Sequence, residues 1–130
     1  QRVRAMAGST VEFVGRVSDE QLAGYYEHAR AFLFPGIEDF GLTPLEAMAG
    51  GCPVLAYGEG GALETVVDGE TGMFFYEQTA ESLAACIEEF EQRSFSASTC
   101  RARAKTFSTD VFKRRFADFC ERALAAGGEL

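Results

Sequence analysis

The sequence predicts an α/β fold in which helices flank a mainly parallel sheet. Short apolar runs alternate with amphipathic helical patterns along the 130-residue chain, and glycine and proline mark where the runs end. Hydrophobic residues make up 47% of the chain, so one packed core can form. The sequence therefore indicates one α/β domain and not a disordered tail.

The first three predicted elements are a strand, a helix and a second strand. Residues 11–15 are mostly apolar and predict the first strand. Ser18 and Gln21 form a capping-box pattern that opens the helix. Its buried stripe would consist of Leu22, Tyr25, Tyr26 and Ala29. Residues 31–34 are continuously apolar, which indicates a strand buried on both faces.

A second helix is predicted to begin after a glycine-bearing loop. Thr43 fits the N-cap, Pro44 the first helical position and Glu46 the third position of a capping box. Gly50 and Gly51 end this helix. Because a capping box satisfies Glu46 without a ligand, a purely structural role for this residue stays open at this point.

In the rest of the sequence, predicted strands and helices alternate once more, and three predicted helices follow them. The next elements are, in order, a strand at 53–57, a mobile glycine-rich turn at 58–61, a brief helix at 62–67, a turn at 68–72 and a strand at 73–75. Three helices follow, at 79–92 with Thr79 as its cap, within 96–105 and from 108 or 109 to about 126. The chain should therefore end in a helical segment.

Charge and cysteine usage restrict the function. The formal net charge is −8 without a basic stripe, which disfavours nucleic-acid binding. The four cysteines form no C-x-x-C pair and the only histidine is His28, so no metal site is expected. The cysteines are Cys52, Cys86, Cys100 and Cys120. Their wide spacing is typical of reduced thiols in the cytoplasm.

The most informative motif spans residues 38–46, where Glu38 and Glu46 flank a loop that leads into a helix start. Helix N-termini attract phosphate through free N–H groups and the helix dipole. Carboxylates accept hydrogen bonds from sugar hydroxyls. The motif therefore suits a polyhydroxylated, phosphorylated ligand. A solvated surface charge is the alternative for Glu38, and also for Arg16 at the end of the first predicted strand.

One ordered set of motifs spans residues 14–72, and the family resemblance that it carries covers roughly residues 8–125. It consists of residues 14–17, 19–22, 34–35, 38–49, 52–54, 60–61, Glu64 and 67–72. This set resembles the C-terminal, donor-binding domain of retaining glycosyltransferases with the GT-B fold, and most closely glycosyltransferase family 4. The resemblance implies a partial Rossmann-like parallel sheet flanked by helices, with a C-terminal helical segment.

The resemblance also implies a role for each part of the motif. Glu38 would lie beside the donor sugar at the reaction centre, and Glu46 would accept hydrogen bonds from the ribose hydroxyls. Backbone N–H groups that bind the sugar and diphosphate would come from Phe40, Gly41, Leu42 and Thr43. Gly15 and Arg16 would border the nucleobase. The reaction would transfer a hexose from a nucleotide-diphosphate sugar, with retained configuration and without a metal or other cofactor.

The chain departs from the pattern of this family at the diphosphate. Family members clamp it with an Arg and a Lys in the first half of the domain, and no segment of this chain matches that pair. We therefore expect residues 1–130 to be a single incomplete donor-binding domain, without the acceptor domain and the first strands. Alone it should be inactive, with an exposed strand edge that allows self-association.

The partners implied by the resemblance are a nucleotide-sugar donor and a sugar or lipid-linked acceptor. The expected location is the cytoplasm, with peripheral membrane contact of the intact parent as a further expectation. Two alternatives stay open: a sugar-nucleotide epimerase or phosphorylase, which share the GT-B architecture, and a non-catalytic α/β assembly module. The donor base, the hexose and the acceptor do not follow from the sequence.

Overall fold

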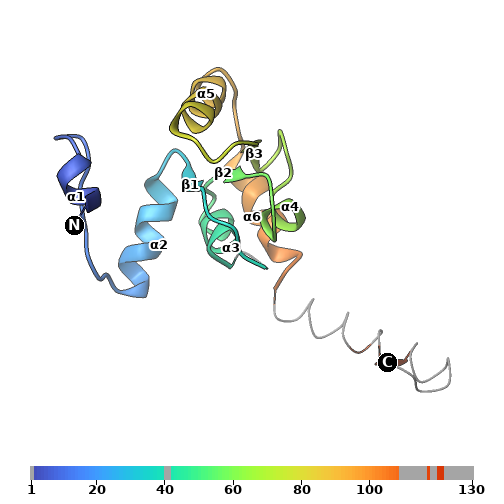
Figure 1. The fold of residues 1–130 in the computed structure, drawn as a ribbon. Helices are drawn as coiled ribbons and strands as arrows, with labels where there is room; N and C mark the ends of the chain where they lie inside the picture. Colours follow the sequence, from blue (N-terminus) through green and yellow to red (C-terminus); the bar gives the residue numbers. More distant parts are fainter. Residues whose placement is uncertain (1, 40–41, 109–116, 118–119, 122–130) are drawn as a thin grey trace.

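The computed structural model shows a three-stranded parallel sheet with helices on both faces (Figure 1). It describes residues 2–39, 42–108, 117 and 120–121. The elements are α1 (Arg2–Met6), α2 (Asp19–His28), β1 (Phe32–Phe34), α3 (Leu42–Ala49), β2 (Val54–Tyr57), α4 (Ala62–Thr65), β3 (Gly72–Phe75), α5 (Ala80–Glu91) and α6 (Ala97–Lys105). The strand order is β1-β2-β3, so the predicted parallel α/β sheet is confirmed.

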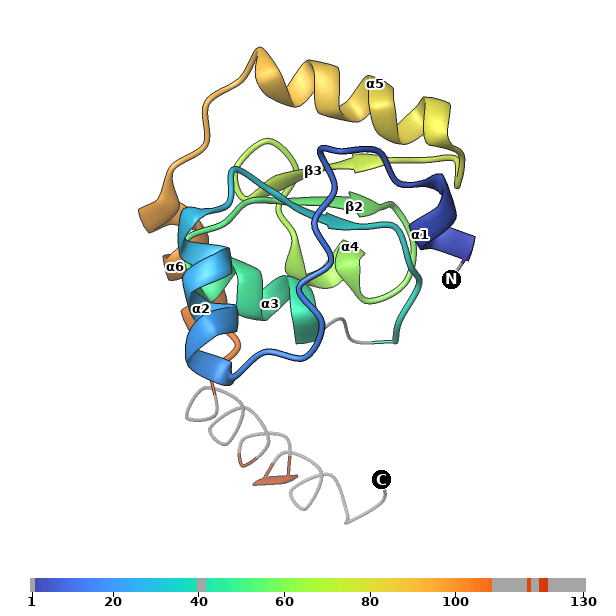
Figure 2. The ribbon, with the colours of Figure 1, turned by 90° about the vertical axis from the view of Figure 1, so that its left-hand side faces the viewer.

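The central strand β2 separates two apolar layers. Val54 and Ala56 point to the layer that contains Met48 of α3. Leu55 points to the opposite layer, where Phe90 of α5 packs. Figure 2 shows this division, with α5 on one side of the sheet and α2, α3, α4 and α6 on the other. Side chains that alternate along a strand reach both faces of its sheet, so β2 anchors both layers.

The helix caps that the sequence predicts are present at α2 and α5. The Ser18 hydroxyl accepts a hydrogen bond from the backbone N–H of Gln21 at 3.1 Å, and the Gln21 side chain accepts one from the Ser18 N–H at 2.9 Å. The Thr79 hydroxyl accepts a bond from the N–H of Ser82 at 3.1 Å. These bonds satisfy N–H groups that have no partner inside a helix, so local chemistry fixes both helix starts.

The strand predicted at residues 11–15 does not form. These residues have no regular secondary structure, and Val11 and Val14 are exposed. A strand needs hydrogen bonds to a neighbouring strand, and in the described part of the chain β1 pairs only with β2. Without a partner, an apolar run remains an extended segment. Residues 2–17 are called the N-terminal arm below, and α1 lies at its end, away from the sheet (Figure 1).

Two predictions of burial were wrong in part. On α2 the stripe residue Tyr26 is buried, whereas Tyr25 and Ala29 are exposed. In β1 the side chain of Leu33 is 43% exposed, so this strand is not buried on both faces. The cause is the position of α5, which packs against β3 at the other edge and leaves the Leu33 face uncovered (Figure 2).

The last predicted helix, from residue 108 or 109 to about 126, lies mostly outside the described residues. Ala117, Cys120 and Glu121 are described and are helical. Among the described helices, none is long and apolar enough to cross a membrane.

Candidate functional site

The loops that follow β1 and β2 are joined at the carboxyl end of the sheet. The backbone N–H of Gly61 donates a hydrogen bond to the carbonyl of Glu38 at 2.7 Å. Gly60 has a φ of 72°, and a Cβ there would lie 2.7 Å from the same carbonyl oxygen. The sequence predicted a mobile turn at residues 58–61. The structure shows this turn packed against the backbone of the first glutamate of the motif.

Glu38 combines a fixed backbone with a carboxylate that has no protein partner. Its residue is exposed, and its carboxylate makes no hydrogen bond or ion pair within residues 2–39 and 42–108. A carboxylate in this state can accept hydrogen bonds from a polar ligand without breaking an existing contact. Its role at the reaction centre remains a prediction.

The helix α3 begins earlier than the sequence predicts. It starts at Leu42, so Thr43 and Pro44 lie inside its first turn and Glu46 is exposed beyond that turn. The predicted capping box of Thr43 with Glu46 is therefore wrong. Proline is tolerated throughout the first turn, because these N–H groups have no acceptor inside the helix, and it does not mark one position.

The early start leaves the hydroxyl of Thr43 without a protein partner. Its Oγ1 is fully buried and forms no hydrogen bond with any described residue. A buried hydroxyl without a partner costs about 1–3 kcal/mol, and most native structures avoid one. The first turn of α3 therefore presents an unused donor and acceptor beside the loop that carries Glu38.

Glu46 lies in a hollow of about 450 Å³ between α2 and α3. The lining residues are Asp19, Leu22, Ala23, Tyr26, Glu46, Ala49 and Gly50. Burial raises the pKa of Tyr26, and the nearby Glu46 carboxylate raises it further. Two carboxylates at the wall of one hollow disfavour a bare anion but can accept hydrogen bonds from hydroxyl groups.

The sequence found Glu46 but missed the contribution of α2. Asp19 and Tyr26 line the same hollow as Glu46, although they precede it by 27 and 20 positions (46 − 19 and 46 − 26). The only sequence signal for these two residues was the capping box at Ser18, which indicates that both lie on a helix. The direction in which α2 faces α3 depends on tertiary packing and does not follow from helical spacing.

Of the other predicted site residues, those that the structure describes do not line the Glu46 hollow. Gly15 and Arg16 lie in the exposed N-terminal arm, where Gly15 has a φ of 66°. Phe40 and Gly41 lie outside the described residues. Leu42 is 60% exposed at the start of α3, next to Thr43. The structure thus brings Leu42, Thr43 and Glu46 onto one helix, and the roles assigned to all these residues remain predictions.

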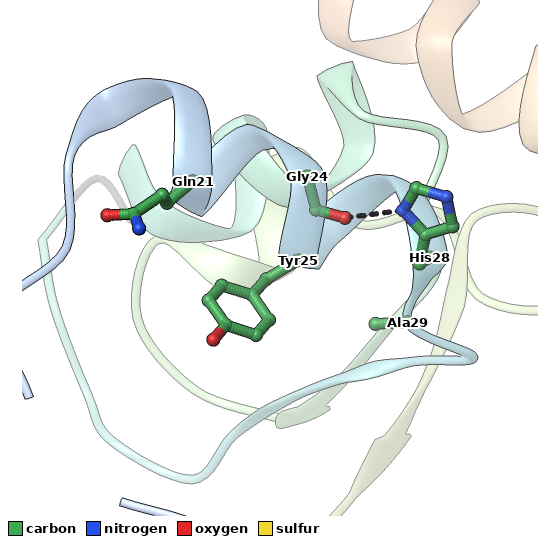
Figure 3. Close-up of a pocket in the computed structure, with 5 residues that line it drawn as sticks. All are labelled: Gln21, Gly24, Tyr25, His28 and Ala29. Atoms are coloured by element: carbon green, nitrogen blue, oxygen red, sulfur yellow. Dashed lines mark hydrogen bonds between the residues drawn. The ribbon is translucent and has the colours of Figure 1, made fainter. Parts of the chain in front are cut away.

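A second hollow, of about 470 Å³, lies away from the motif on α2. Figure 3 shows its lining residues along this one helix: Gln21, Gly24, Tyr25, His28 and Ala29. The ring Nδ1 of His28 donates to the carbonyl of Gly24 at 2.9 Å, within the last turn of the helix. This hollow contains none of the predicted site residues, and its size alone does not make it the functional site.

The cysteines of the core behave as small apolar side chains. Cys52, Cys86 and Cys100 are buried and free. Burial raises the pKa of Cys52 to about 11 and also raises the pKa of Cys86 and of Cys100. A protonated thiol is a poor nucleophile and a poor metal ligand. Among the described residues, no group of three His, Cys, Asp or Glu side chains could hold a metal ion.

The sequence matches known glycosyltransferases over most of its length. The family model described as glycosyl transferases group 1 matches residues 4–107. The D-inositol 3-phosphate glycosyltransferase of Streptomyces avermitilis is 33% identical over 133 aligned positions, which cover 97% of this chain and 29% of that protein. The α-1,3/1,6-mannosyltransferase ALG2 of Homo sapiens is 32% identical over 123 positions, covering 90% and 29%.

Solved structures agree with this match. Sucrose-phosphate synthase from Thermosynechococcus elongatus superposes with a TM-score of 0.80 at 31% identity, covering 97% of this chain and 34% of that one. Anabaena HepE, solved in complex with UDP and glucose, superposes with a TM-score of 0.64 at 27% identity, covering 90% and 33%. The chain thus spans about a third of these proteins, and its sheet and helices have the partial Rossmann-like architecture of a GT-B domain. Since the family model covers most of its length, the chain belongs to the glycosyl transferases group 1 family.

Proposed function

We propose that the intact protein transfers a hexose from a nucleotide-diphosphate sugar to an acceptor, with retained configuration and without a bound metal. The chain would supply the donor side of the reaction. Family membership supports this proposal, as does the UDP and glucose bound to Anabaena HepE. A sugar or lipid-linked acceptor would bind to another part of the intact protein, in the cytoplasm and, for a lipid-linked acceptor, at the membrane surface.

Each element of the site has a distinct role in this proposal. Glu38 acts beside the donor sugar, held in place through its backbone by Gly61. Backbone N–H groups of Phe40 and Gly41, and of Leu42 and Thr43 at the start of α3, bind the sugar and the diphosphate. A helix N-terminus favours the negative charge that develops on the leaving diphosphate. Glu46 accepts hydrogen bonds from the ribose, and Gly15 and Arg16 border the base.

The observation that carries this proposal is the buried hydroxyl of Thr43. It lies in the first turn of α3, five positions after Glu38 in the sequence, and it has no partner among the described residues. A ligand oxygen at this helix start would satisfy the free N–H groups of the first turn and, once the Thr43 side chain rotates toward the ligand, the buried hydroxyl as well. A folding role alone does not account for the unsatisfied hydroxyl.

The proposal predicts how two variants bind nucleotides. In calorimetric titrations with UDP, GDP and ADP and without added metal, one nucleotide should bind the wild-type chain. Glu46→Ala should weaken this binding by about 1–3 kcal/mol, the range for a lost charge-assisted hydrogen bond. Thr43→Val should also weaken it but should leave the free energy of unfolding unchanged or raised, because it removes a buried polar group that has no protein partner.

The control is Glu88→Ala on α5, which makes the same charge change on the opposite side of the sheet. It should not alter nucleotide affinity. Unchanged affinity in Glu46→Ala would contradict the ribose assignment. If Thr43→Val binds nucleotide as the wild type does, the hydroxyl is not part of the donor site and the main structural support for the proposal is lost.

A further inference from the structure

Two hydrogen bonds connect α6 to the end of α4. The guanidinium of Arg103 donates from Nε to the carbonyl of Thr65 at 2.9 Å and from its second Nη to the carbonyl of Glu64 at 2.7 Å. The last carbonyls of a helix have no partner inside it, and a cation near them also favours the helix dipole. Arg103 therefore caps the C-terminus of α4 from a helix almost forty positions away.

The helix α4 depends on this cap. It is only four residues long, and its N-cap Gly61 provides no side-chain hydrogen bond. Such a short helix is not stable by itself in water. Inside this turn, the backbone N–H groups of Glu64 and Thr65 donate to the carbonyl of Gly61 at 3.0 Å and 3.3 Å, and the Thr65 hydroxyl donates to the same carbonyl at 3.4 Å. The turn is thus held at its start by Thr65 and at its end by Arg103.

The same turn holds Glu38. The carbonyl of Gly61 accepts hydrogen bonds from Thr65. The backbone N–H of the same Gly61 donates to the carbonyl of Glu38 at 2.7 Å. A continuous series of hydrogen bonds therefore runs from Arg103 through Thr65 and Gly61 to Glu38. Because α6 also packs against α3, which carries Glu46, the helix that carries Arg103 supports both glutamates of the motif.

We propose that Arg103 is a positioning residue that sets the place of Glu38 relative to Glu46. The catalytic meaning of this position rests on the function proposed above, whereas the mechanical link does not. Arginine suits the task because its planar fork donates to two carbonyls at once. Its stacking on Phe107, with the guanidinium carbon 4.9 Å from the ring centroid, further restricts the fork.

The test is amide hydrogen exchange measured by NMR on this chain. Arg103→Ala should accelerate exchange of the Gly61 amide about tenfold, the factor that corresponds to losing a hydrogen bond to a charged group. The amide of Val54, which is bonded to the carbonyl of Thr71 in the core, should keep its protection. Lys105→Ala is the matched control, since it removes the same charge from the same helix turn and should leave Gly61 unchanged.

A second variant keeps the test decisive if Arg103→Ala lowers the protection of Val54 as well. Arg103→Lys retains the charge but lacks the fork, so Gly61 should exchange at a rate between those of the wild type and the alanine variant. Unchanged Gly61 exchange in both variants would overturn the positioning role.

The function is tested separately, by titrating the wild type with UDP-glucose, GDP-glucose and ADP-glucose. Accelerated Gly61 exchange in a chain that binds none of these nucleotide sugars supports the mechanical link and counts against the donor site. Binding of one of them, together with unchanged Gly61 exchange in both Arg103 variants, supports the donor site and overturns the positioning role.

Discussion

The N-terminal arm and the central strand β2 both contain an apolar run, yet the two runs differ in burial and in strand pairing. Val11, Phe13 and Val14 of the arm are exposed, and the hydrogen bonds of residues 2–17 all remain local. Leu55 of β2 is 1% exposed, and its strand is paired on both sides. The difference teaches that an apolar run becomes a strand only where a neighbouring strand pairs with it.

The two regions should differ most in the free energy of unfolding that is lost when one apolar side chain in each is truncated. Leu55→Ala should lower the free energy of unfolding by about 2–5 kcal/mol, because it leaves a cavity beneath α5. Val14→Ala should change it by less than about 0.5 kcal/mol, since this side chain is exposed. Denaturant titrations of both variants measure the two values. A comparable loss for Val14→Ala would show that the arm packs against the domain.

A smaller contrast should come from adding a methyl group to a glycine in each region. A Cβ on Gly72 of β3 would overlap the backbone carbonyl of Val54, so β2 and β3 would have to separate. Gly72→Ala should therefore cost about 1–3 kcal/mol. Gly8→Ala in the arm has no atom within 4 Å of the new methyl group and should leave the thermal midpoint unchanged. A lower thermal midpoint of Gly8→Ala would contradict the proposed difference between the two regions.

The smallest expected effect is a dependence of stability on alkaline pH that only the core provides. Burial raises the pKa of Cys52 from an ordinary 9.0 to about 11. Below pH 9 the thiol is protonated in both states and its contribution is complete. As the pH rises toward 11, the unfolded chain loses its proton first, so the folded state loses stability. Residues 2–17 contain no cysteine and cannot contribute to this effect.

Denaturation midpoints measured from pH 8 to pH 11 test this expectation. The decline should be shallower in Cys52→Ala than in the wild type. Cys120→Ala, which changes a thiol outside the buried core, serves as the control. An equal decline in all three proteins would show that another group causes it.

The parts of the fold that the sequence predicts well are those determined within a few residues. Ser18 and Gln21 satisfy each other across one helical turn, so their spacing alone locates the start of α2. At α5 a single hydrogen bond, from the Ser82 N–H to the Thr79 hydroxyl, locates the helix start. In contrast, residues 11–15 have a strand-like pattern but need a partner strand, and Leu33 needs a covering helix. Neither requirement can be recognised in the local sequence.

Local sequence predicts the candidate site only in part, as it does the fold. The spacing of Glu38 and Glu46 identifies the motif from the sequence alone. The start of α3 at Leu42 was not predictable, because proline fits several positions of a first turn. The hydrogen bond from Gly61 to Glu38 and the cap from Arg103 join segments that are distant in the sequence. Only the folded chain brings these groups together.

The contact between Gly60 and Glu38 also restricts how this site can change by evolution or engineering. A side chain at position 60 would press on the Glu38 carbonyl, and lengthening either loop alone would separate the Gly61 N–H from its acceptor. Neither loop can therefore be altered independently of the other. Residues 36–39 and 58–61 therefore have to vary as one unit, and a graft from a relative has to exchange both segments together.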